Sequence, residues 1–122
     1  MKQVEHGLQV AVARLLELCL DPARTWWSGI DHAAKLGPRY GADRKRRGVK
    51  RGLPDFLIFV EDEPPLGLEI KTEDGRLQPS QRDLRSDWLR IGARYCIARS
   101  LREVQEMLVE HGVPMRQRMK IF

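Results

Sequence analysis

The chain has 122 residues, the size of one domain, with 42% hydrophobic and 32% charged residues, a composition typical of a globular protein. It has no stretch near the roughly 18 apolar residues of a membrane span, and its first residues lack the apolar core of a signal peptide. We therefore expect a single cytoplasmic domain over residues 1–122 with no membrane partner. The net charge of +5 favours a polyanionic partner only weakly. Cys19 and Cys96 are too few and too isolated for a disulfide framework or a zinc site, and are expected to be buried.

The first half of the chain predicts one clear helix. Apolar residues recur at helical spacing from Val4 to Leu20, and the Asp-Pro step at 21–22 ends the pattern. Residues 25–28 predict a short strand. Between residues 31 and 52 glycines interrupt the pattern, and only a short helix over 42–47 is expected there.

A strongly basic segment lies between Lys35 and Arg51, with Asp43 as its only acidic residue. Such a run is either a solvated loop or a phosphate-binding surface, and composition alone leaves both open. The candidates for contacts to DNA phosphates are Arg44, Lys45, Arg46, Arg47, Lys50 and Arg51.

Two strands joined by a short turn follow. The run from Asp55 to Val60 is continuously apolar after its first residue, which predicts a strand covered on both faces. The segment Leu66 to Thr72 predicts the second strand of a hairpin. Because side chains alternate along a strand, Glu69 and Lys71 leave the same face.

The rest of the chain predicts helix, strand and helix. A helix from Gln78 to about Gly92 is expected to bury Leu84, Trp88, Leu89 and Ile91. A strand at 95–98 precedes a helix over 101–111, whose start at Ser100 and Glu103 has the pattern of a capping box. Residues 114–122 alternate basic and apolar residues and predict a last strand or an ordered arm. The order predicts an α/β fold with a small mixed sheet flanked by helices.

Three residues of the hairpin suggest a catalytic centre. Asp55 opens one strand, and Glu69 and Lys71 lie in the other. Charges inside apolar strands are costly unless they have partners, and two converging carboxylates need a cation between them. Mg²⁺ or Mn²⁺ favours carboxylate, carbonyl and water ligands, and can polarise a phosphoryl oxygen. With Lys71 to orient water or to stabilise charge on the phosphate, these are the parts needed for phosphodiester hydrolysis.

Each residue taken alone has an ordinary structural explanation. Asp55 could be a turn residue, and Glu69 with Lys71 could lie on an exposed strand face. The order of the pieces is more informative: Pro-Asp opens an apolar strand, a short turn follows, and Glu-x-Lys closes the next strand. His32 could be a base or a metal ligand, although a lone histidine is more often structural.

These residues resemble the PD-(D/E)XK nuclease superfamily, with Pro54-Asp55 and Glu69-Ile70-Lys71 as its two signature pieces. The surroundings are similar to the VRR-NUC family. Residues 49–55 resemble its Val-Arg-Arg stretch leading into Gly-x-Pro-Asp, with Lys50 at the middle position, and residues 77–81 resemble the polar motif that follows Glu-x-Lys. The chain length matches the stand-alone, phage-type members.

The resemblance implies a PD-(D/E)XK restriction-endonuclease-like fold in one VRR-NUC-type domain, in a bacterial or phage-infected cell. The metal ligands would be Asp55, Glu69, Glu5 and the backbone carbonyl of Ile70, and the catalytic set would be Lys71, Asp55, Glu69 and Gln81. Glu5 could instead be first-turn helix charge, and Gln81 an ordinary polar residue at a helix start.

We therefore expect a Mg²⁺- or Mn²⁺-dependent DNA endonuclease. Similarity of the stand-alone members to archaeal Holliday junction resolvases implies a homodimer acting on branched DNA, either a Holliday junction or a flap. Trp26, Trp27, Leu57 and Phe59 are candidates for the interface or the core. The alternatives are a catalytically inactive nucleic-acid-binding module on a nuclease scaffold and an accessory subunit that recruits DNA for a partner.

Overall fold

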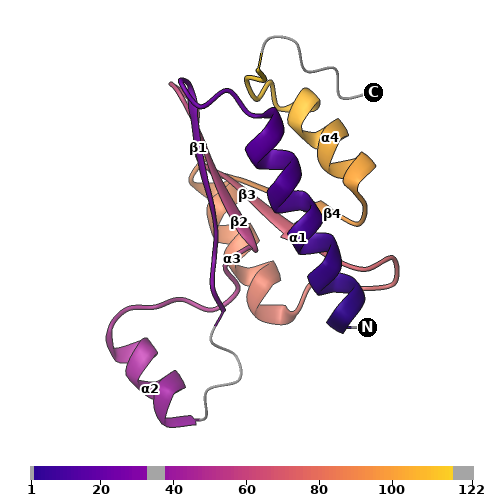
Figure 1. Cartoon of the computed structure of the whole chain (residues 1–122). Coiled ribbons are helices and arrows are strands. Elements are labelled where there is room, and N and C mark those ends of the chain that lie inside the picture. Colours follow the sequence, from indigo (N-terminus) through magenta and orange to yellow (C-terminus); the bar gives the residue numbers. More distant parts are fainter. Residues whose placement is uncertain (1, 33–37, 117–122) are drawn as a thin grey trace.

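The computed structural model describes residues 2–32 and 38–116 (Figure 1). Side chains are described from Val4 to His32 and from Gly41 to Arg116. Lys35 and most of the predicted C-terminal strand or arm lie outside these residues.

A four-stranded sheet forms the centre of the fold. Its strands are β1 (Thr25–Gly29), β2 (Phe56–Val60), β3 (Leu66–Ile70) and β4 (Arg94–Ala98), and they lie side by side in chain order. The pairs β1–β2 and β2–β3 are antiparallel, whereas β3–β4 is parallel, so the sheet is mixed as predicted. The parallel pair requires a crossover, which the helix α3 (Pro79–Arg90) provides.

Helices cover the two faces of the sheet unequally (Figure 1). α1 (Lys2–Cys19) and α4 (Leu101–Glu110) pack together on one face, where Val12, Leu16 and Leu108 are fully buried. α3 packs on β4 from the other side, with Leu84 buried. Because α3 covers only part of that face, the strands β1 and β2 are left partly open there.

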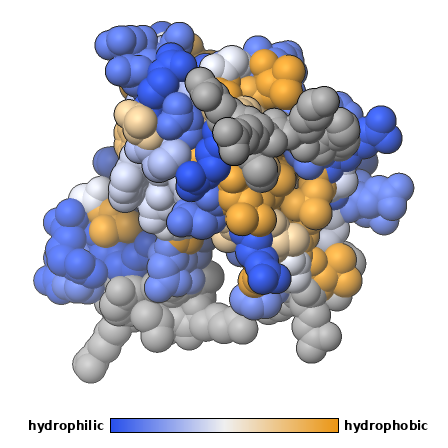
Figure 2. Space-filling model, turned by 45° about the horizontal axis from the view of Figure 1, so that its top comes forward, coloured by the Kyte–Doolittle hydropathy of each residue, from blue (hydrophilic) through white to orange (hydrophobic). Residues whose placement is uncertain are grey.

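This uneven cover corrects two predictions about burial. β3 is buried throughout, but β2 alternates, and Phe59 is 43% exposed because no helix lies over it. Leu89 and Ile91 were expected in the core, but Leu89, in the last turn of α3, and Ile91, directly after it, are 49% and 71% exposed. On the face shown in Figure 2, hydrophilic side chains dominate and hydrophobic ones form separate patches.

The helix α2 (Pro38–Arg46) stands apart from the sheet and carries much of the basic segment (Figure 1). It begins four residues earlier than predicted, at a proline, which is favoured in the first turn of a helix. The described residues contain no helix long and apolar enough to cross a membrane.

The capping-box prediction at α4 is half right. The Ser100 hydroxyl accepts a hydrogen bond from Glu103 N at 3.1 Å, as predicted. The Glu103 carboxylate, however, accepts from Arg99 N at 3.2 Å rather than from Ser100 N. The helix start is therefore capped, with the return bond displaced by one residue.

Candidate active site

Asp55 lies directly before β2 and is fixed by bonds to both neighbouring strands. Its backbone carbonyl accepts a hydrogen bond from Ile30 N, and its Oδ2 accepts one from Ile70 N, each at 2.8 Å. The side chain is therefore held at the end of β3, close to Glu69. The sequence had suggested that Asp55 and Glu69 converge, but it gave no sign of the bond to Ile70 N.

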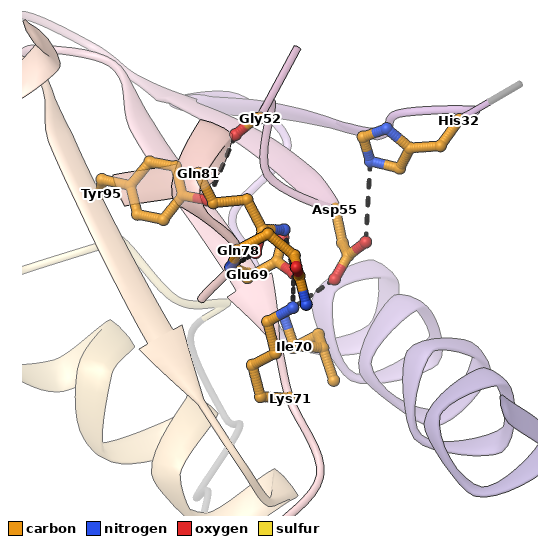
Figure 3. A network of polar contacts seen from close by, with 9 residues as sticks. All are labelled: His32, Gly52, Asp55, Glu69, Ile70, Lys71, Gln78, Gln81 and Tyr95. Atoms are coloured by element: carbon orange, nitrogen blue, oxygen red, sulfur yellow. Dashed lines mark hydrogen bonds and ion pairs between the residues drawn. The ribbon is translucent and has the colours of Figure 1, made fainter. Parts of the chain in front are cut away.

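Glu69 and Lys71 lie at the end of β3, and both are buried, at 2% and 9% exposure. Lys71 Nζ is 3.1 Å from Glu69 Oε2, and Gln81 Nε2 donates to the same oxygen at 2.8 Å (Figure 3). The Gln81 Oε1 in turn accepts from Gln78 N at 2.9 Å, which fixes the amide orientation. Gln81 thus contacts Glu69 directly, whereas the resemblance had implied support of Lys71 or of water.

Glu5 comes to this site from α1, 50 residues before Asp55 and 64 before Glu69 along the sequence. One carboxylate oxygen from each of Glu5, Asp55 and Glu69 lies within 4.8 Å of the others. Glu69 Oε1 is buried and has no hydrogen-bond partner among the described residues. A buried acceptor without a donor is costly, so a cation beside three carboxylates is the fitting partner for it. The residues present therefore suit a divalent metal ion.

The electrostatics of the site also favour a bound cation. Burial, and then the nearby charge of Asp55, raises the pKa of Glu69 to about 7, although Lys71 and Gln81 act in the opposite direction. Burial likewise raises the pKa of Asp55, against the bond from Ile70 N. Without a cation, the folded protein thus carries these negative charges at a cost.

Two glycines allow the strands and α3 to meet at the site. Gly52 has φ +86°, and a Cβ there would lie 2.3 Å from Ser80 O at the start of α3. At Gly67 a Cβ would lie 2.7 Å from ring atoms of both Pro54 and Trp88. These glycines let the segment leading to Asp55 pack against α3. The role of these two glycines could not be predicted from the sequence, because a close approach between separate segments leaves no periodic signal.

The predicted DNA-binding residues lie on α2 and the segment after it. Arg46 and Arg47 pair with Asp43, at 3.6 and 3.0 Å, so part of their charge is neutralised within the helix. Lys45, Lys50 and Arg51 are exposed, and Arg44 is half-buried. The structure brings none of these six residues into the cluster of carboxylates, and their contact with DNA stays a prediction.

His32 was weighed as a base or metal ligand. Its Nε2 lies 3.7 Å from Asp55 Oδ1, on the side of the site away from Lys71 (Figure 3). The structure therefore places it beside the carboxylates.

A separate cavity of about 560 Å³ lies between α3, β4 and α4. It contains the two half-buried groups Cys96 and His111, with Cys96 Sγ 3.2 Å from His111 Nε2. Cys19 is buried, as predicted. None of the carboxylates Glu5, Asp55 and Glu69 lines this cavity, so it is distinct from the candidate active site.

A solved structure described as a VRR_NUC domain protein is similar to this chain, with a TM-score of 0.63 and 22% sequence identity, over 86% of this chain and 84% of that one. The chain has the fold of a VRR_NUC domain. This similarity confirms the predicted fold. The similar structure carries the name of the family that residues 49–55 and 77–81 resemble. No protein-family model matches the sequence, and no curated relative matches it.

Proposed function

We propose that this chain is a VRR-NUC-type nuclease of the PD-(D/E)XK superfamily that hydrolyses phosphodiester bonds in DNA. The observation that carries the proposal is the buried Glu69 Oε1, which has no hydrogen-bond partner in the described part of the chain. It lies among three converging carboxylates, with a buried lysine alongside. A scaffold that only binds DNA would gain nothing from burying these charges, which argues against the catalytically inactive DNA-binding module.

The residues that would hold a Mg²⁺ or Mn²⁺ ion are Glu5, Asp55 and Glu69, with the backbone carbonyl of Ile70 as a fourth ligand. Such an ion supplies Lewis-acid polarisation of a phosphoryl oxygen. Asp55 has Oδ2 held by Ile70 N, so its Oδ1, which lies 3.7 Å from His32 Nε2, is the oxygen that could act as a ligand. Glu69 is fixed through Oε2 by Lys71 and Gln81, which leaves Oε1 for the same purpose.

Lys71 is proposed as the catalytic lysine. Its ammonium group is fixed by Glu69 and carries three donors, so it can hold the attacking water or a phosphate oxygen while still contacting Glu69. Losing one such preorganised donor costs about 10²–10³ in rate.

Cleavage of labelled DNA tests the proposal. Wild-type protein is expected to cut with Mg²⁺ or Mn²⁺ and to stop with EDTA. Lys71→Met keeps the aliphatic bulk and removes the donors, so it should lose about 10²-fold or more in rate. The control is Arg102→Met, which removes an exposed positive charge on α4, away from the carboxylate cluster. Metal-independent binding without turnover by the wild type would support the inactive module or the accessory subunit and overturn the proposal.

The proposed substrate is branched DNA, a Holliday junction or a flap, and this rests on the family resemblance. A panel of linear, flap, splayed and four-way substrates tests it. Equal rates on linear and branched DNA would contradict structure selectivity and leave the nuclease proposal intact.

We also propose a homodimer, formed through the open face of β1 and β2. Trp26 and Phe59 are 59% and 43% exposed there, and their ring centroids are 5.8 Å apart. Trp27 packs against the core and Leu57 is half-buried, so neither is a main contact. Light scattering should give a dimer for wild type and a monomer for Trp26→Glu. Val109→Glu, at a 64% exposed position on α4, is the control and should stay dimeric.

A further inference from the structure

The segment that leaves β1 passes directly beside the candidate active site. Gly29, the last residue of β1, is paired with Phe56 of β2, and Ile30 N donates to Asp55 O at 2.8 Å. These backbone bonds bring His32 to the site, with its Nε2 3.7 Å from Asp55 Oδ1. The sheet thus fixes the backbone as far as Ile30, two residues before His32.

The imidazole of His32 is available for a ligand. The 3.7 Å contact with Asp55 Oδ1 is within ion-pair distance but too long for a hydrogen bond, so Nε2 can still donate to a ligand. The His32 side chain is 39% exposed, while that of Asp55 is 10% exposed. The ring therefore borders the site from the solvent side, where a DNA strand would arrive.

His32 does not belong to the metal-binding cluster. Among the described residues, the acidic and histidine groups close enough to share one ion are Glu5, Asp55 and Glu69. A role toward the substrate accounts for its position better than a role as a ligand.

His32 and Lys71 lie on opposite sides of the two buried carboxylates. Lys71 contacts Glu69, His32 faces Asp55, and Figure 3 shows the carboxylates between them. In phosphodiester hydrolysis the attacking and leaving oxygens lie roughly in line across the phosphorus. If Lys71 holds the attacking water, the His32 side of the site is the side of the leaving oxygen.

We propose that His32 donates a hydrogen bond from Nε2 to the leaving oxygen of the DNA strand, a role that rests on the proposed nuclease function. Water forms a new P–O bond as the P–O bond to the leaving oxygen breaks, and that oxygen keeps the bonding electron pair. A proton from the attacking water passes to solvent, and the leaving oxygen takes one from solvent to become a hydroxyl. The imidazole N–H stabilises the negative charge that develops before the proton arrives.

Substrates with a sulfur atom in place of the leaving oxygen test this role. The ends of the wild-type products identify which bridging oxygen leaves. A thiolate leaves readily without help because its conjugate thiol has a low pKa. His32→Ala should lower kcat roughly 100-fold on ordinary DNA with Mn²⁺, but only about threefold on the sulfur substrate. His32→Gln, which keeps an N–H donor, should recover part of the loss.

Two further measurements separate this role from a structural one. DNA affinity in EDTA should stay within about twofold of wild type for His32→Ala, because a contact to developing charge adds little to ground-state binding. The control is His6→Ala, an exposed histidine on α1, which should cleave both substrates at the wild-type rate.

If His32→Ala lost the same factor in kcat on both substrates, or lost none on either, the assignment of His32 would be overturned. Cleavage by the wild type would still support the proposed function. Absence of cleavage by the wild type would overturn both together.

Discussion

Replacing Glu69 with glutamine should stabilise the metal-free protein at neutral pH while abolishing cleavage. Burial and then the nearby charge of Asp55 raise the pKa of Glu69 from 4.5 to about 7, despite the opposing attraction of Lys71. The folded protein therefore binds a proton that the unfolded chain has lost. The stabilisation from this proton is full below pH 4.5 and is lost as the pH rises through about 7.

The size of the effect follows from the shift. A rise of about 2.5 in pKa, at 1.36 kcal/mol for each unit, is on the order of 3 kcal/mol at pH 8. Glutamine resembles the protonated acid: its oxygen can accept from Gln81, and its amide can donate toward the carboxylates of Glu5 and Asp55. For a chain of this size the gain corresponds to roughly 10 °C in Tm.

Urea unfolding followed by circular dichroism, in EDTA at pH 5 and pH 8, measures this effect. The wild type should have a lower free energy of unfolding at pH 8 than at pH 5, and Glu69→Gln should show a smaller decrease. Glu61→Gln, an exposed carboxylate paired with Arg24, serves as control and should follow the wild type. A Glu69→Gln protein less stable than wild type at pH 8, or one with an unchanged pH dependence, would refute the reasoning.

Three further outcomes are expected. Mn²⁺ should raise the Tm of wild type in a thermal melt but raise that of Asp55→Asn much less, and equal shifts would place the ion elsewhere. Gly67→Ala should destabilise by about 1–3 kcal/mol in urea unfolding because its Cβ would meet two rings at 2.7 Å. Gly7→Ala, where the added Cβ on α1 meets open space, should instead stabilise the protein by about 0.5–1 kcal/mol. Stability changes of the same sign in the two glycine variants would contradict the packing argument. Lys50→Ala and Arg51→Ala should each lower the slope of log affinity for DNA against log salt concentration by about 1, and an unchanged slope would remove them from the interface.

The sequence predicted most of the elements because their signals are local. The apolar stripe of α1, the hairpin of β2 and β3, and the alternation that puts Glu69 and Lys71 on one face all depend on neighbours in sequence. The same alternation, with Asp55 at the head of the adjacent strand, was enough to identify the candidate site.

The features that the sequence did not predict depend on tertiary packing. The exposure of Phe59, Leu89 and Ile91 depends on how the helices pack on the sheet, and an apolar run carries no information on that packing. The bond from Ile70 N to Asp55 and the close packing at Gly67 are contacts between separate segments. Periodicity does not report such contacts, because it describes only one element at a time.

The most direct test of the central claim is a single-turnover cleavage time course on a branched DNA with Mn²⁺, for wild type and Asp55→Asn side by side. Asparagine can still accept the bond from Ile70 N, so the fold is retained while one charge of the carboxylate cluster is removed. The account predicts cleavage by the wild type and a loss of about 10²-fold or more in the variant. Equal rates for the two proteins, or no cleavage by the wild type, would contradict it.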